Sequence, residues 1–218
     1  MAFARYGLAG YNLGSAALWF DILWRSTVVL LSGSHQVWGE VEATLTIVQA
    51  GAALEVAFAA CRLIRSPVAT TAVQVFARCC LLFGCLKYSP TATAHWGCAL
   101  MVTTWACADI PRYLFYFCKQ FGAVPTQVES LRFNLFLGLY PLGVCAEIVC
   151  LWVAATDVHR NGPRLLLPHN CELSLYAVLY TCAATLYLPC FPMLYRHMLA
   201  QRAKMYKARL GKTQSAVE

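Results

Sequence analysis

The 218-residue chain is strongly apolar, because 60% of its residues are hydrophobic and only 12% are charged. Soluble domains are usually about 45–50% apolar and about 25% charged, so this composition excludes an ordinary soluble domain. The net charge is +7, and six basic residues crowd the C-terminal tail: Arg196, Arg202, Lys204, Lys207, Arg209 and Lys212. Behind an apolar segment, such a run is typical of a cytosolic tail beside anionic lipid rather than of a nucleic-acid-binding region.

Six apolar segments follow one another along the chain, at residues 13–31, 41–64, 68–86, 96–117, 133–155 and 173–194. Each is close to the roughly 20 residues that cross a 30 Å hydrocarbon core as a helix. In lipid the backbone must satisfy its own polar groups, which favours helices over open strands. We therefore predict an all-α fold with about six transmembrane helices in one bundle. Residues 13–195 form this catalytic domain, between a cytosolic segment (1–12) and a basic cytosolic tail (196–218).

The connections between these segments are short and contain breakers of regular structure. Asp21 and Arg25 interrupt the first segment, and their spacing of four lets them pair on one helix face. Turn signals separate the later segments at Ser66-Pro67, Ser89-Pro90, Gly122, Pro125 and Gly162-Pro163. The sequence contains no internal repeat and no sign of a second domain.

The distribution of basic residues predicts the orientation in the membrane. With a cytosolic N-terminus, the cytosolic pieces hold eleven basic residues, which are the six of the tail and Arg5, Arg62, Arg65, Lys119 and Arg132. The opposite side holds three, Lys87, Arg160 and Arg164. Basic residues favour the cytosolic side, so both termini are expected there.

The twelve cysteines lie mostly within the apolar segments. They show neither a Cys-x-x-Cys motif nor cysteine and histidine at zinc spacing, so we predict no metal site. Cysteine packs as a small hydrophobic residue, and this packing role is the one expected here.

Tyr140 and Glu147 are the most informative polar residues inside a predicted span. They are seven residues apart, so they lie two turns apart on one helix face, with a rise of about 10 Å between them. A carboxyl group and a phenol in low-dielectric surroundings suit proton transfer, as a β-elimination of water requires. A structural glutamate paired with an arginine of another span is the alternative from the residues alone.

Small residues and a proline surround this pair. Pro141 removes a backbone donor, which leaves the carbonyl of Leu137 without its helical partner. Gly138 and Gly143 keep the neighbouring surface low. Together these features predict a small polar notch beside Tyr140.

Further charged residues fall within the predicted spans, where a charge costs roughly 2.5–3.5 kcal/mol and therefore faces the bundle interior. Asp109 and Arg112 are three apart, which favours an ion pair on one helix. Arg78 has no local acidic partner and can reach Asp109, Glu55 or a substrate phosphate. Gln74 is an uncharged companion.

Several runs of the sequence resemble one family. Leu139-Tyr140-Pro141-Leu142-Gly143, followed by Glu147, is similar to the Leu-Tyr-Pro-x-Gly-x-x-x-Glu motif of the 3-hydroxyacyl-CoA dehydratases, also called the protein-tyrosine-phosphatase-like A family. Asp109-Ile110-Pro111-Arg112-Tyr113, Leu54-Glu55-Val56 and Tyr195-Arg196-His197 resemble other runs of that family. The resemblance covers nearly the whole chain in the same order.

This resemblance implies a six-span protein of the endoplasmic reticulum that dehydrates (3R)-3-hydroxyacyl-CoA to trans-2-enoyl-CoA in fatty-acid elongation. It implies Tyr140 and Glu147 as the catalytic pair and no cofactor. The expected partners are the acyl-CoA substrate, the bilayer, and the condensing enzyme and reductases of elongation. We predict substrate contacts at Arg65, Arg78, Arg112, Tyr113, Lys119 and Arg132, and structural support from Glu55, Gln74 and Asp109.

The chain departs from the family pattern at Phe58, Asp109, Pro111 and Phe133. The catalytic pair is intact, so the departures bear on chain-length preference and on how the pair is supported. Phosphatase chemistry, which the family's older name suggests, is excluded. It needs an arginine six residues after a cysteine, and here Cys61 is followed at that spacing by Pro67.

Three other function classes are compatible with the sequence. A catalytically weak scaffold of the elongation enzymes would differ from an enzyme only in turnover. A small transporter would commonly show inverted repeats, which are absent here. A membrane adaptor acting through its basic tail would leave Tyr140 and Glu147 without a role.

Overall fold

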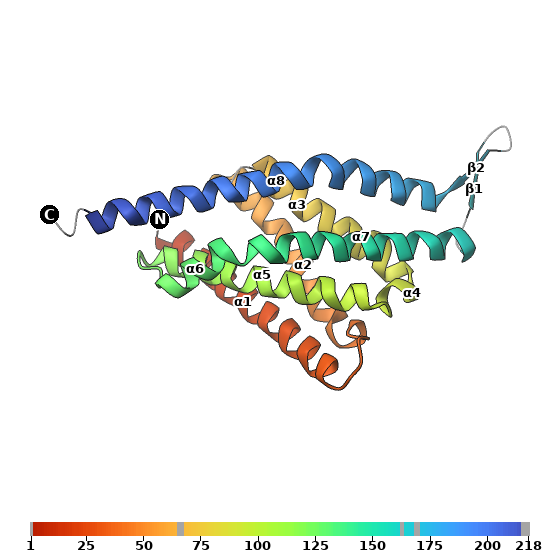
Figure 1. Ribbon diagram of the computed structural model, residues 1–218, viewed down its shortest axis with the longest axis horizontal. Helices are drawn as coiled ribbons and strands as arrows, with labels where there is room; N and C mark the ends of the chain where they lie inside the picture. Colours follow the sequence, from red (N-terminus) through yellow and green to blue (C-terminus); the bar gives the residue numbers. More distant parts are fainter. Residues whose placement is uncertain (1, 65–67, 162–163, 168–170, 215–218) are drawn as a thin grey trace.

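The computed structural model describes residues 2–64, 68–161, 164–167 and 171–214. The long elements are α1 (Ala2–Leu31), α2 (Trp38–Ala60), α3 (Val68–Cys79), α5 (Trp96–Gln120), α7 (Phe136–Asn161) and α8 (Leu175–Gln214). Short helices, α4 (Pro90–Thr93) and α6 (Thr126–Asn134), flank α5. Figure 1 shows the long helices side by side in one elongated bundle, which confirms the predicted all-α class.

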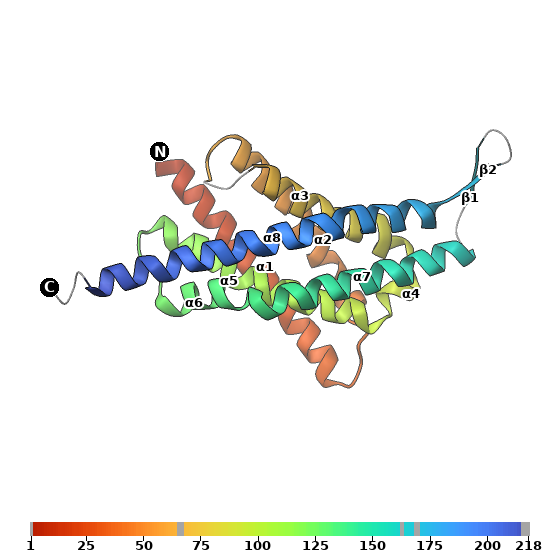
Figure 2. The same ribbon diagram turned by 45° about the horizontal axis from the view of Figure 1, so that its top comes forward.

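A small sheet in the connection between α7 and α8 was not predicted. Strands β1 (Arg164–Leu167) and β2 (Cys171–Ser174) pair antiparallel, with Leu165 opposite Leu173. The predicted sixth span began at residue 173, so its first residues belong to this hairpin. The hairpin lies at one end of the bundle, and the N-terminal end of α1 and the C-terminal end of α8 lie at the other (Figures 1 and 2).

Helix ends differ from the predicted boundaries most strongly at the two termini. Helix α1 begins at Ala2 rather than residue 13, and α8 continues to Gln214 rather than ending at residue 194. Both extensions carry polar residues, so hydrophobicity alone did not mark them as helix. The predicted third span is also less regular, because α3 passes into a π-helix, η1 (Cys80–Cys85), and a 3-10 turn, η2 (Leu86–Tyr88).

Four described helical segments are long and apolar enough to cross a membrane: Arg5–Leu31, Trp38–Ala60, Thr71–Tyr88 and Phe136–Asp157. Helices α5 and α8 are not among these four. Helix α5 carries Asp109 and Arg112 in its interior, and these charges are covered by neighbouring helices instead of facing outward.

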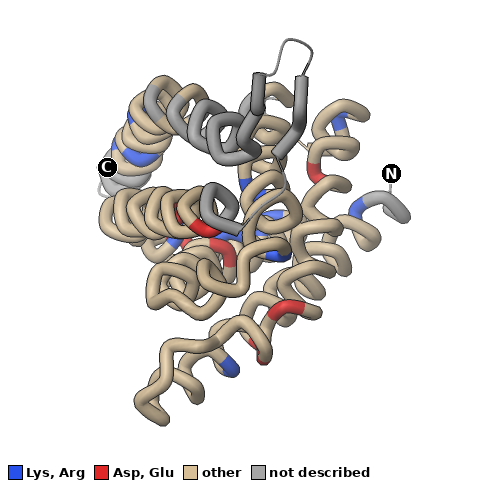
Figure 3. Tube along the Cα trace, turned by 90° about the vertical axis from the view of Figure 1, so that its right-hand side faces the viewer, with Lys and Arg blue, Asp and Glu red and all other residues tan. Residues whose placement is uncertain are grey.

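Helix α5 occupies the middle of the bundle, where it packs against both α1 and α7. Helix α8 covers the other side of α7, and α2 contacts α1 and α3. The buried core joins large side chains of several helices: Trp19, Ile22, Leu45, Leu82, Met101 and Trp105. Viewed along the bundle, basic and acidic positions also come together between the helices (Figure 3). The core therefore surrounds a polar centre.

Several residues that were predicted to interrupt regular structure form caps or turns at helix ends. Ser89 caps α4, since its hydroxyl accepts a hydrogen bond from the Ala92 amide at 3.2 Å and Pro90 occupies the first turn. Gly33 and Gly122 follow α1 and α5 with positive φ angles, which glycine adopts without steric cost. The Arg25 guanidinium donates to Asp21 at 3.0 Å, which confirms the predicted pair in α1.

Close backbone approach joins α5 to α7. A Cβ atom at Gly97 would lie 2.8 Å from Cγ1 of Val149, and one at Gly143 would lie 3.4 Å from the Thr104 hydroxyl. Gly138, by contrast, has open space where its Cβ would be. Of the two glycines predicted to keep the surface of α7 low, only Gly143 is used for helix contact.

Among the cysteines whose side chains the structure describes, none forms a disulfide bond with another described cysteine. Cys85, Cys98 and Cys150 are buried in the core. Their packing role agrees with the prediction from their apolar surroundings.

Candidate active site

Glu147 of α7 points into the bundle, where two side chains hold its carboxylate. The indole N–H of Trp105, on α5, donates to Oε1 at 2.6 Å. The hydroxyl of Tyr187, on α8, donates to Oε2. Each carboxylate oxygen therefore has a donor from a different neighbouring helix, and the carboxylate is fixed between α5 and α8.

Tyr140 lies on the same face of α7, as predicted, and also meets α8. Its ring stacks on Phe191 with centroids 5.3 Å apart and on Tyr195 at 6.1 Å. Phe136, one turn earlier, contacts Tyr195 at 5.9 Å. Helices α7 and α8 therefore run antiparallel. Phe136 meets Tyr195, Tyr140 meets Phe191, and Glu147 meets Tyr187.

Pro141 has the predicted effect on the backbone of α7. The carbonyl oxygen of Leu137 lacks its helical donor, and the hydroxyl of Tyr195 donates to it at 3.4 Å. A side chain of α8 thus takes the place of the missing amide. The proline therefore ties α7 to α8 close to Tyr140.

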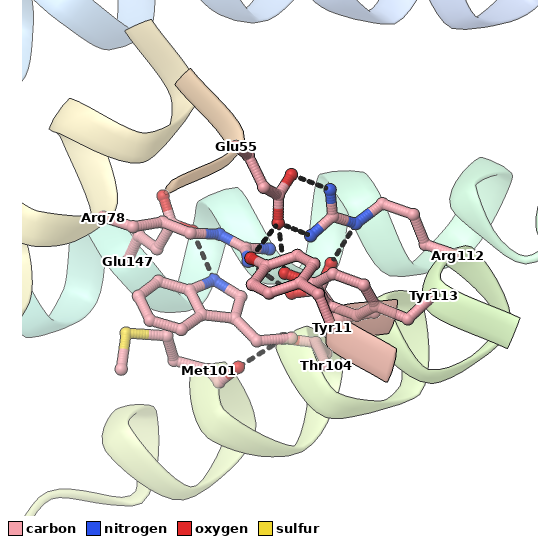
Figure 4. A network of polar contacts seen from close by, with 10 residues as sticks. Tyr11, Glu55, Arg78, Met101, Thr104, Arg112, Tyr113 and Glu147 are labelled. Carbon is pink, nitrogen blue, oxygen red and sulfur yellow. Dashed lines mark hydrogen bonds and ion pairs between the residues drawn. The ribbon is translucent and has the colours of Figure 1, made fainter. Parts of the chain in front are cut away.

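A second polar group lies next to this site and links α1, α2 and α5 (Figure 4). Glu55 of α2 accepts two hydrogen bonds from the Arg112 guanidinium, at 2.7 and 3.1 Å, and one from the Tyr113 hydroxyl. Tyr11 of α1 donates to Glu55 at 3.3 Å. Arg112 also donates to Asp109 at 2.8 Å, which confirms the predicted ion pair within α5.

Arg78 of α3 connects the charged network to Trp105, which donates to Glu147. Its guanidinium forms an ion pair with Asp109, one of the three partners left open by the sequence. It also lies over the Trp105 ring, 4.6 Å from the centroid. Arg78 therefore supports Trp105, the residue that donates to Glu147.

The other predicted site residues lie elsewhere. Lys119 is exposed near the end of α5, with its ammonium 5.7 Å from the Phe115 ring. Arg132, on α6, lies 5.9 Å from the Tyr116 ring and lines a shallow hollow with Phe136 and Met198. Gln74 is exposed on α3, outside the network described above, and Arg65 lies outside the described residues.

Two residues that hold Glu147, Trp105 and Tyr187, were not predicted. Tyr187, Phe191 and Tyr195 recur every four residues, so an aromatic stripe on one helix face was visible in the sequence. Trp105 lies four residues before Asp109 and therefore shares its helix face. In the part of the chain that the structure describes, no three His, Cys, Asp or Glu side chains cluster as a metal site would require.

The departures from the family pattern are accommodated by local packing. Phe58 packs edge-to-face on Tyr11 at 5.3 Å, and Phe133 packs on Phe115 at 5.6 Å. Asp109 binds both Arg78 and Arg112 despite its shorter side chain. Pro111 is buried within α5, which continues through it.

A family model described as protein tyrosine phosphatase-like protein, PTPLA, matches residues 49–208. This range includes the Tyr-Pro motif and Glu147, and also Glu55, Arg78, Asp109 and Arg112. The chain belongs to this family.

Curated relatives match over most of their length. A very-long-chain (3R)-3-hydroxyacyl-CoA dehydratase of Caenorhabditis elegans, hpo-8, is 35% identical over 204 residues, covering 91% of this chain and 93% of the relative. The dehydratase PASTICCINO 2A of Oryza sativa subsp. japonica is 31% identical, with 93% and 94% covered. Dehydratase 2 of Homo sapiens is 31% identical, with 89% and 78% covered. No solved structure matches this chain significantly.

Proposed function

We propose that this chain is a membrane-embedded dehydratase that converts long-chain (3R)-3-hydroxyacyl-CoA into trans-2-enoyl-CoA, the third step of fatty-acid elongation. The observation that carries the proposal is the Glu147 carboxylate, held inside the bundle by Trp105 and Tyr187 on the face of α7 that also bears Tyr140. Relatives named for this reaction match about nine-tenths of the chain, which supports the same assignment.

In the proposed mechanism, Glu147 removes a proton from C2 of the substrate, which the thioester carbonyl makes acidic. The C2–H electron pair forms the C2–C3 double bond as the C3–O bond breaks. Tyr140 donates its proton to the departing hydroxyl, which leaves as water. Water then carries the proton from Glu147 back to Tyr140, so that both groups return to their starting state. The redox state of the substrate does not change overall.

Arg78 and Arg112 are better suited to supporting this site than to binding the substrate directly. Both guanidinium groups already bind buried carboxylates, and Arg78 lies on the Trp105 ring. Tyr113 likewise donates to Glu55. We therefore assign these three residues to the polar support of the site, together with Glu55 and Asp109.

The CoA group is proposed to bind at the end of the bundle that carries α6 and the N-terminal end of α1. Lys119 and Arg132 lie there, and Arg5 lies 5.2 Å from the Phe121 ring at the same end. Counted from Phe136, Tyr140 is about 6 Å and Glu147 about 16 Å along α7. An acyl chain entering from this end would therefore meet Tyr140 before Glu147.

In the membrane, we propose that six segments cross: α1, α2, α3 with η1 and η2, α5, α7 and α8. An even number of crossings agrees with the position of both ends of the chain at one end of the bundle (Figure 1). That end is proposed to be cytosolic and the membrane to be the endoplasmic reticulum, where the condensing enzyme and reductases of elongation would be neighbours. We propose a cytosolic position for the segments 1–12 and 196–218 that flank the domain at 13–195. Their described parts, 2–12 and 196–214, continue helices α1 and α8.

The test is turnover of a defined substrate by the purified protein in detergent. Long-chain 3-hydroxyacyl-CoA is supplied and trans-2-enoyl-CoA is followed for the parent, Tyr140→Phe and Glu147→Gln. We expect product from the parent and a loss of about 100- to 10,000-fold in each variant, the usual contribution of a general acid or base. A folded parent that makes no product at several chain lengths would overturn the enzyme assignment in favour of a scaffold.

A further inference from the structure

Each oxygen of the Glu147 carboxylate accepts a hydrogen bond from a neutral donor. Trp105 reaches Oε1 from α5 and Tyr187 reaches Oε2 from α8. Each carboxylate oxygen has two lone pairs, so one donor on each oxygen still leaves two of about four acceptor positions open. The arrangement therefore fixes the direction of the carboxylate without occupying every position that could accept a proton.

The first donor is itself rigidly held. Trp105 is 2% exposed, so its indole ring has little freedom to turn. The Arg78 guanidinium covers one face of that ring at 4.6 Å, and Asp109 anchors Arg78 through an ion pair. The position of the indole N–H is therefore set by a chain of contacts that begins in the charged network.

The second donor comes from the helix that also lies against Tyr140. Tyr187 is one turn from Phe191, whose ring stacks on Tyr140 at 5.3 Å. A single face of α8 thus contacts both proposed catalytic residues. Since Tyr187 binds the carboxylate and Phe191 packs on the phenol ring, α8 fixes the two residues relative to each other.

We propose that Trp105 and Tyr187 are positioning residues that aim the Glu147 carboxylate at the substrate proton, an inference that rests on the proposed dehydratase function. In this proposal neither residue exchanges a proton with the substrate. Proton transfer depends steeply on alignment, and a misplacement of about 1 Å can cost about 100-fold in rate. The two donors act on kcat because alignment matters in the transition state and contributes little to substrate binding.

The test uses substitutions that remove each donor and keep an aromatic side chain. Tyr187→Phe and Trp105→Phe are expected to lower kcat by about 10- to 100-fold, with KM changed less than threefold. Tyr206→Phe and Trp24→Phe are matched controls. Tyr206 donates to Asn134 far along α8, Trp24 is 63% exposed, and both variants are expected to keep kcat within twofold.

An infrared measurement tests the same contacts without turnover. The band of the Glu147 carboxyl group is identified from the difference between the parent and Glu147→Gln. It is expected to shift in Tyr187→Phe and in Trp105→Phe and to stay unchanged in both controls, because only the first two lose a hydrogen bond to that group. Each variant tests one donor, so either substitution alone decides the role of its own residue.

The outcomes separate this inference from the proposed function. A parent without turnover rejects the dehydratase, and the infrared shifts then still decide whether the two donors hold Glu147. An active parent that loses activity in Glu147→Gln but keeps it in Tyr187→Phe and Trp105→Phe overturns the positioning role. A rise in KM at constant kcat also overturns it, since that pattern marks substrate binding.

Discussion

Glu55 and Asp109 are acids that the bundle covers almost completely, with side-chain exposures of 10% and 5%. Both have arginine partners from another helix, Arg112 for Glu55 and Arg78 for Asp109. A buried charge costs several kcal/mol unless partners compensate it. The network is therefore a set of mutually dependent residues, in which the loss of one charge leaves another uncompensated.

Glu55→Gln is expected to destabilise the protein by about 3–5 kcal/mol, because it leaves the partly buried Arg112 without one of its two anionic partners. Reversible unfolding in mixed detergent, followed by tryptophan fluorescence, measures the change in free energy of unfolding. Asp21→Asn is the matched control. It breaks the exposed pair with Arg25, which is expected to contribute less than about 1 kcal/mol. Equal losses in the two variants would contradict the burial argument.

Arg78→Lys is expected to lower kcat about tenfold or more and to leave KM nearly unchanged. A lysine ammonium keeps the charge opposite Asp109, but it lacks the planar fork and the flat group that covers the Trp105 ring. Steady-state kinetics on 3-hydroxyacyl-CoA gives both constants. If KM rises instead while kcat is kept, Arg78 binds the substrate and the supporting role assigned here is wrong.

At the scale of elements, the contact between α5 and α7 decides where Glu147 lies. The two helices approach closely at Gly97, whose hypothetical Cβ would lie 2.8 Å from Cγ1 of Val149. Val149 is two residues beyond Glu147, so any displacement of α7 there moves the carboxylate. This position on α5 thus links helix packing to the geometry of the site.

Gly97→Ala is expected to destabilise the protein by about 1–3 kcal/mol, because the added methyl group overpacks the α5–α7 contact. It is also expected to lower turnover by displacing α7. The same unfolding and turnover measurements report both effects. The double variant Gly97→Ala, Val149→Ala should recover part of the loss, since it removes the methyl groups that the new Cβ meets.

Gly14→Ala is the control for this prediction. Gly14 lies on the exposed side of α1, where a Cβ would meet nothing within 4 Å. Alanine favours helix over glycine by about 1 kcal/mol, so this variant is expected to be neutral or slightly stabilising. If Gly14→Ala destabilised the protein as much as Gly97→Ala, the loss in Gly97→Ala could not be attributed to overpacking at the α5–α7 contact.

At the scale of the molecule, several basic residues outside the charged network belong to the end that carries the helical termini. Arg5, Lys119, Arg132 and Arg202 belong to elements that meet at this end (Figure 1). At the opposite end, Lys87 pairs with Glu42 at 3.8 Å, which offsets its charge. This asymmetry agrees with a cytosolic position for the termini.

A glycosylation acceptor tripeptide inserted after Gly33 is expected to be modified when the chain is made in the presence of microsomes. The connection from α1 to α2 lies at the end away from the termini, which would face the lumen. The same tripeptide appended to the C-terminus should remain unmodified. A gel shift measures both, and modification of the C-terminal site alone would invert the proposed orientation.

Much of the fold could be predicted, since the helices form where apolar residues continue for about 20 positions. The ends of α1 and α8 were missed because polar residues can remain helical outside the apolar stretch, as α8 does when Arg202 binds Asn134 of α6 at 3.0 Å. The irregular turn after α3 was missed because Cys80–Cys85 is as apolar as an ordinary helix. Hydrophobicity carries no information about which hydrogen-bonding pattern the backbone adopts.

The sequence by itself determined the helical class, the shared face of Tyr140 and Glu147, the Asp109–Arg112 pair and the free carbonyl left by Pro141. These depend on local spacing within one helix, which the periodicity of 3.6 residues sets. Only the tertiary structure decided that Arg78 pairs with Asp109, that Arg112 binds Glu55, and that Trp105 and Tyr187 hold Glu147. Those contacts join different helices, and their partners depend on how the helices pack and turn relative to one another, which spacing along a single helix does not fix.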